Sequence, residues 1–115
     1  MQIPKPTTAD MDRFRGCVPT GPGVEVKPMF GNLGAFVNGN MFMGLFGADI
    51  GIKLAPTDAT ALLAVDGAGP FGPAERPMGG YVTMPPDLIG TPEGDRWIGL
   101  ALEYVAGFPP KSPKR

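Results

Sequence analysis

The stretch AFVNGNMFMGLFGADIGIKL, residues 35–54, limits the possible fold more than any other part of this 115-residue chain. Its apolar residues continue in short runs that indicate β-strands, and turn residues interrupt them at 38–40 and 47–49. Asn and Gly accept the positive φ angles that tight hairpin turns require. The stretch therefore predicts three antiparallel strands, and the alternating segment VEVKPMF, residues 24–30, extends them to a four-stranded meander. Pro28 lacks an amide donor, which predicts an edge position for that first strand.

The central strands are apolar on both sides. This is unusual, because the sheet of a small α+β domain normally has one buried face and one solvent-exposed face. Successive side chains of a regular strand point to opposite sides. One side then holds Met41, Met43, Leu45, Ala35 and Val37, and the other holds Phe36, Phe42 and Phe46. Two explanations remain open: helices cover both sides of the sheet, or a second copy of the chain covers one of them. The second explanation predicts a homodimer with an interaction surface formed by Phe36, Phe42, Phe46, Met41 and Met43.

Helical signals flank these strands. A short helix is expected from Thr8, its N-cap, to about Gly16, and a second from Pro56 to Gly67. An amphipathic third helix is expected from Thr91 to Gly107, with Thr91 as its N-cap and Pro92 at its first helical position. Residues 67–77 predict a loop that places Phe71 against the sheet, and residues 78–84 predict a fifth short strand. The fold class is therefore α+β, with an antiparallel sheet of about five strands flanked by N-terminal and C-terminal helices. We expect one domain at residues 8–108, after an extended lead-in at 1–7 and before a basic extended tail at 109–115.

Several kinds of catalytic site are excluded by composition. The chain has no histidine, which removes His-dependent triads and imidazole metal ligands. Cys17 is its single cysteine, so neither a disulfide within the chain nor a thiolate zinc site can form. The glycine-rich segments lack the Gly-Lys-Ser/Thr of a phosphate-binding loop. We therefore expect no enzyme, no catalytic residues, no cofactor and no metal.

The charged residues are nearly balanced, with 10 Lys and Arg against 11 Asp and Glu. Three of the basic residues, Lys111, Lys114 and Arg115, lie in the tail, which leaves an acidic body. Because nucleic-acid binding depends on clustered Lys and Arg, a nucleic acid is an unlikely partner. No apolar segment is long enough to cross a membrane and the N-terminus does not resemble a signal peptide, so we expect a cytoplasmic protein without a membrane partner.

A family resemblance rests on motifs spread along the chain. They are Met29-Phe30-Gly31, Gly34, Asn38-Gly39 followed by Met41-Phe42, Lys53-Leu54, Pro70-Phe71, and the block RPM…YVTMPP from Arg76 to Pro86. In this order and spacing the sequence resembles the N-terminal domain of the TfoX/Sxy family, bacterial proteins linked to regulation of natural competence. The resemblance covers about residues 8–108.

The resemblance implies an α+β domain with a terminal helix, an antiparallel sheet and a C-terminal helix, similar to the secretion-chaperone-like arrangement and often dimeric. The family's competence regulators carry a second, C-terminal helical domain that is not present in these 115 residues. We therefore expect a stand-alone relative with a partner of its own.

Three hypotheses for function follow. The first is a non-enzymatic regulatory or protein-interaction module that forms a homodimer and binds an unknown protein partner. The second is a nucleic-acid-associated regulator that uses the basic tail. The third is a small ligand-binding protein with a groove beside Arg76 and Tyr81.

Overall fold

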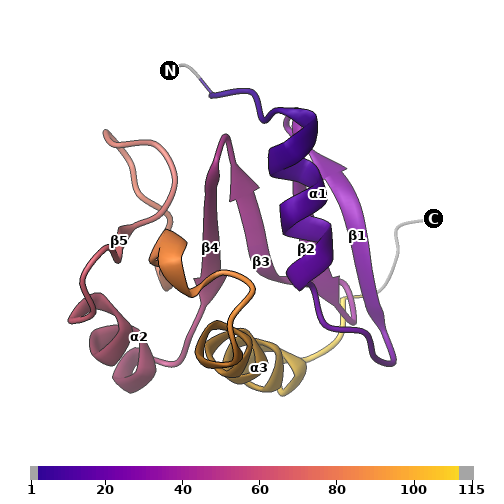
Figure 1. Ribbon diagram of the computed structural model, residues 1–115. Coiled ribbons are helices and arrows are strands. Elements are labelled where there is room, and N and C mark those ends of the chain that lie inside the picture. The colour runs from indigo at the N-terminus through magenta and orange to yellow at the C-terminus, as the bar shows by residue number, and fades with distance from the viewer. Residues whose placement is uncertain (1–2, 112–115) are drawn as a thin grey trace.

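The computed structural model describes residues 3–111 and consists of one antiparallel sheet with helices packed against it (Figure 1). Its elements in chain order are α1 (Thr8–Cys17), β1 (Val24–Met29), β2 (Asn32–Val37), β3 (Asn40–Phe46), β4 (Asp49–Lys53), α2 (Pro56–Leu63), β5 (Gly69–Pro70), β6 (Tyr81–Thr83), the 3-10 turn η1 (Pro86–Leu88) and α3 (Pro92–Ala106). The six strands lie in the order β1-β2-β3-β4-β6-β5. The predicted α+β class and the four-stranded meander are confirmed.

The hairpin turns have the backbone geometry that the sequence predicts. Asn38 and Gly39 both have positive φ, 51° and 84°, between β2 and β3. The turn between β1 and β2 places Phe30 at φ 50°, a conformation that few non-glycine residues adopt. β1 is an edge strand, as Pro28 predicts.

The segment 67–77, expected to be only a loop, also contributes a strand. Gly69 and Pro70 of β5 pair with β6, and the Thr83 hydroxyl donates a hydrogen bond to the Pro70 carbonyl at 2.8 Å. The expectation for Phe71 is confirmed, because this side chain is 2 % exposed and lies against the sheet.

The helices begin at polar caps. The N-cap of α1 is Thr7, one residue earlier than the sequence prediction, and it forms a capping box with Asp10. Thr91 caps α3 by accepting a hydrogen bond from the Gly94 amide at 3.1 Å, and Pro92 occupies the first turn, as predicted.

All three helices contribute to one core on one side of the sheet. Phe14 of α1, Leu62 of α2 and Ile98 of α3 are each at most 1 % exposed and belong to a single buried cluster. Figure 1 shows α1 and α3 on the near side of the strands. The sheet residues in this cluster are Leu33, Ala35, Val37, Phe42, Met43, Leu45, Ile50, Ile52 and Val82. The opposite side of the sheet, which we call the uncovered face, receives no helix from the described residues.

A β-bulge in β3 overturns the predicted arrangement of its side chains. Ala35 pairs with Met43 but Phe36 pairs with Met41, so Phe42 is an extra residue in the ladder. The extra residue reverses the alternation, which places Met41 with Phe36 on the uncovered face and Phe42 in the core. Phe42 and Met43 are both 0 % exposed. The prediction that these two residues belong to an interaction surface is therefore wrong.

Candidate functional site

A row of three glycines crosses the centre of the uncovered face. Gly34 pairs with Gly44, and Gly44 pairs with Gly51, in the adjacent strands β2, β3 and β4. Directly opposed residues of an antiparallel ladder lie on the same face. The sheet therefore has no side chains along this row, and other groups can approach its backbone closely.

Phe71 occupies one end of the glycine row. A Cβ atom on Gly51 would overlap the Phe71 ring, whereas one on Gly44 would lie 3.4 Å from it. The ring also packs against Phe46, at 6.2 Å between centroids with an edge-on geometry, and against Tyr81 at 6.0 Å. Phe71 thus anchors the segment between β5 and β6 on the sheet.

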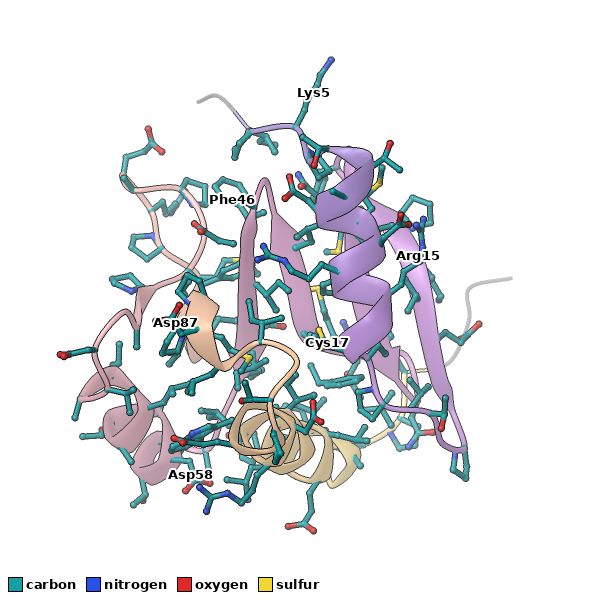
Figure 2. The ribbon with its side chains drawn as sticks, in the orientation of Figure 1. Lys5, Arg15, Cys17, Phe46, Asp58 and Asp87 are labelled. Carbon is teal, nitrogen blue, oxygen red and sulfur yellow. The ribbon has the colours of Figure 1, made fainter. Side chains whose placement is uncertain are left out.

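A groove of about 460 Å³ lies beside Phe71, and it is mostly apolar. Its wall on one side is the segment that follows β5, and its other walls are the sheet and the N-terminal segment. The lining residues are Ile3, Met29, Phe30, Asn32, Leu33, Met41, Gly44, Leu45, Phe46, Phe71, Pro73, Arg76 and Met78. In Figure 2, Phe46 lies between the β3–β4 hairpin and that segment. Arg76 is the single charged residue among the lining residues of this groove.

The segment that forms the wall is held by backbone hydrogen bonds. The Met78 amide donates to the Phe71 carbonyl at 2.8 Å, and the Arg76 amide donates to the Pro73 carbonyl at 3.0 Å. Arg76 thus lies on a closed turn and is exposed at the rim of the groove.

Tyr81 does not line the groove but packs against Phe71, which does. Its hydroxyl donates a hydrogen bond to the Met41 carbonyl at 3.0 Å, and its ring packs on Phe71. Burial raises the pKa of Tyr81 to about 12, so the hydroxyl stays protonated at neutral pH. Of the two residues predicted to form a ligand groove, Arg76 therefore lies at the rim of the groove, and Tyr81 contacts it only through the lining residues Phe71 and Met41.

Asn32, the buried polar side chain of the groove, has partners at both of its amide atoms. Its Nδ2 donates to the Pro4 carbonyl at 3.1 Å, and its Oδ1 accepts from the Gly47 amide at 2.8 Å. This side chain ties the N-terminal segment to the β3–β4 turn. Because Asn32 already forms these hydrogen bonds, the groove offers a ligand few side-chain groups for hydrogen bonding.

A second apolar cluster extends from the groove toward β1. The side chains of Met29, Phe36 and Met41 all lie within 3.3 Å of the Cβ position of Gly34. Lys27 Nζ lies 5.2 Å from the Phe36 ring centroid and 3.9 Å from Glu25 Oε1. Phe30, on the turn at the end of β1, is 79 % exposed.

The predicted site residues are thus divided. Met41, Phe46 and Arg76 line the groove, and Phe36 lies beside it. Sequence reasoning missed the lining residues Met29, Phe30, Phe71 and Met78. The available signal was the presence of glycines inside three successive apolar strands, because interior glycines often mark a close approach to the backbone.

Other candidate groups do not form a reactive site. The Cys17 thiol donates to the Phe14 carbonyl at 3.3 Å, and burial raises its pKa to about 11, so the nucleophilic thiolate is scarce at neutral pH. In residues 3–111, no three His, Cys, Asp or Glu side chains are close enough to hold a metal ion.

The predicted basic tail lies partly outside the described residues. The Lys111 amide donates to the Asn38 carbonyl at 2.9 Å, while Lys114 and Arg115 are not among the residues that the structure describes. None of the described helices has the length and apolarity needed to cross a membrane.

Comparison with known proteins agrees with the architecture. The family model of the TfoX N-terminal domain matches residues 17–104. Neither the comparison with curated proteins nor the comparison with solved structures gave a match. The matched range begins at the last residue of α1 and ends within α3, so it contains all six strands and every lining residue of the groove except Ile3. The family match covers most of the chain, and this protein belongs to the TfoX N-terminal domain family.

Proposed function

We propose that this protein is a non-enzymatic regulatory module that acts by contact with other protein chains. Membership in the TfoX N-terminal domain family, which the sequence resemblance links to competence regulators, supports the regulatory part of this proposal. The observation that supports the contact part is the uncovered face, where apolar side chains remain accessible although all three helices pack on the other side.

The contact surface we propose contains Phe30, Phe36 and Met41. A phenylalanine that is 79 % exposed beside an apolar groove is typical of a residue that is buried in a complex. Large aromatic side chains often supply much of the free energy of binding at protein interfaces.

A second copy of this chain is the partner that we propose. A two-fold interface brings the same patch of both copies together, so the patch must be complementary to itself. β1 carries Glu25 and Lys27 on the side of Phe36. An antiparallel arrangement of two such strands places Lys27 of each copy near Glu25 of the other, while the apolar side chains meet between them.

Light scattering after size-exclusion chromatography tests this proposal. We expect the wild-type protein to have the mass of a dimer and Phe30→Asn to dissociate at a higher concentration. Asn is chosen because it tolerates the positive φ of position 30, so the turn is preserved. The matched control is Leu63→Asn on α2, where the leucine is 48 % exposed and does not line the groove.

The control variant is expected to keep the wild-type mass. A wild-type protein that remains a monomer up to millimolar concentration would contradict the proposed homodimer. Equal effects of the two substitutions would contradict the assignment of the contact surface to Phe30.

A further inference from the structure

We propose that the groove is a binding site for a small amphiphile with a flexible apolar chain and one terminal carboxylate. This inference goes beyond the proposed function and does not depend on dimer formation. The groove volume of about 460 Å³ is in the range of small-molecule sites, which are about 300–1,000 Å³. Phe71 and the segment behind it form a wall, so a ligand would be held between that wall and the sheet.

The interior of the groove selects an apolar ligand body. Asn32 already uses both amide atoms, and Gly44 lies within the paired ladder of β3 with β2 and β4. A sugar or a nucleobase would lose its hydrogen bonds with water and find few replacements here, which is unfavourable. A hydrocarbon chain forms no hydrogen bonds with water that it could lose, and the burial of its apolar surface is favourable.

The lining also favours a flexible chain over a rigid ring system. Three of the lining residues are methionines, namely Met29, Met41 and Met78. Methionine side chains are unbranched and rotate easily, so they adapt to irregular apolar shapes. Gly44 also lines the groove, and Met41 Cε and Phe71 Cε2 each lie 3.4 Å from the position that its Cβ atom would take.

Arg76 selects the head group. It is the only charged residue of the groove lining, and it forms no ion pair or side-chain hydrogen bond with another described residue. The planar guanidinium group matches a carboxylate with two parallel hydrogen bonds. A phosphate carries close to two negative charges at neutral pH, and the second would have no partner in this lining. One arginine therefore fits a monoanion best.

Isothermal titration calorimetry with saturated fatty carboxylates of increasing length tests the site. We expect hexanoate, octanoate and decanoate to bind with an affinity that rises about fourfold for each added methylene, because each one is buried in the apolar interior. The corresponding alcohol should bind less tightly than each carboxylate, because it cannot pair with Arg76.

Two variants locate the binding in the groove. Arg76→Gln should abolish the difference between decanoate and decanol, whereas Arg96→Gln, an exposed arginine on α3, should preserve it. Gly44→Ala adds a methyl group to the groove lining, 3.4 Å from Met41 Cε and Phe71 Cε2, and should weaken both ligands several-fold.

Failure to bind decanoate would overturn this inference, as would equal affinity for decanoate and decanol in the wild type. Binding that is unchanged in Arg76→Gln would also overturn it, because it would show that the carboxylate lies elsewhere. Phe30 and Met41 line the groove and also belong to the proposed dimer surface, so each titration is made on a sample whose mass has been measured by light scattering. Decanoate binding by a protein that stays monomeric would refute the dimer and support this inference. Absence of binding at a protein concentration where light scattering gives the mass of a monomer would overturn this inference without bearing on the dimer.

Discussion

Gly51 and Gly44 are adjacent members of the glycine row, but they differ in the space available to a side chain. At Gly51 a Cβ atom would overlap the Phe71 ring, so Phe71 must move to accommodate alanine. Overpacking of this kind lowers the free energy of unfolding by about 1–3 kcal/mol. At Gly44 the added carbon would make ordinary contacts at 3.4 Å, and alanine reduces the conformational entropy of the unfolded chain.

We therefore predict that Gly51→Ala lowers the midpoint of urea unfolding and that Gly44→Ala leaves it unchanged or raises it. The two variants serve as controls for each other, because both add one methyl group to a central strand. Equal midpoints for the two variants would show that Phe71 does not pack on Gly51 as described.

The N-terminal cap of α1 stabilises the helix as a whole. The Thr7 hydroxyl accepts a hydrogen bond from the Asp10 amide at 3.0 Å, and the Asp10 carboxylate accepts one from the Thr7 amide at 2.9 Å. Loss of such a cap lowers the free energy of unfolding by about 1 kcal/mol. Thr7→Ala should show this loss in urea unfolding, and Thr8→Ala, one residue into the helix, should show much less. A larger effect at Thr8 would contradict the capping box.

The same cap predicts a pH dependence. Two hydrogen bonds to Asp10, one from the Thr7 amide and one involving the Thr7 hydroxyl, hold the pKa of Asp10 below its usual value of 3.8. Because the folded pKa is the lower one, this contribution to stability is present above pH 3.8 and is lost as the pH falls through the folded pKa. In an NMR titration, the pKa of Asp10 should rise toward its usual value in Thr7→Ala. An unchanged pKa would show that the Thr7 hydroxyl does not contribute.

The secondary structure elements were largely predictable because their signals are local. Pro28 indicated an edge strand, Asn38 and Gly39 indicated a hairpin, and Thr91 indicated the start of α3. β5 was missed because a strand of two residues that includes a proline has no periodicity of its own. The N-cap of α1 was placed one residue late because Thr7 and Thr8 have equivalent side chains.

The candidate site was predicted only in part, because its geometry depends on pairing between strands. Nothing in the β3 sequence marks Phe42 as a bulged residue. The bulge is defined by the register of β3 against Ala35 and Phe36 of β2. Without it, Met41 and Phe42 are assigned to the wrong sides. The alignment of Gly34, Gly44 and Gly51 into one row likewise follows from the register and is not visible in any single strand.

At the scale of the whole molecule, the two sides of the sheet have different roles in this account. The covered side contains the common core of the three helices. The uncovered face contains the glycine row, the groove with Arg76 and the exposed Phe30. The central claim is that this uncovered face is the surface through which the protein makes its contacts.

The methyl NMR spectrum of the methionines, recorded from micromolar to millimolar protein concentration, tests this claim most directly. Met29, Met41 and Met78 line the groove, while Met43 and Met84 are at most 1 % exposed and serve as internal controls. The account predicts that the methyl signals of Met29 and Met41 shift with concentration and that those of Met43 and Met84 do not. Signals of Met29 and Met41 that stay constant over the whole range would contradict it.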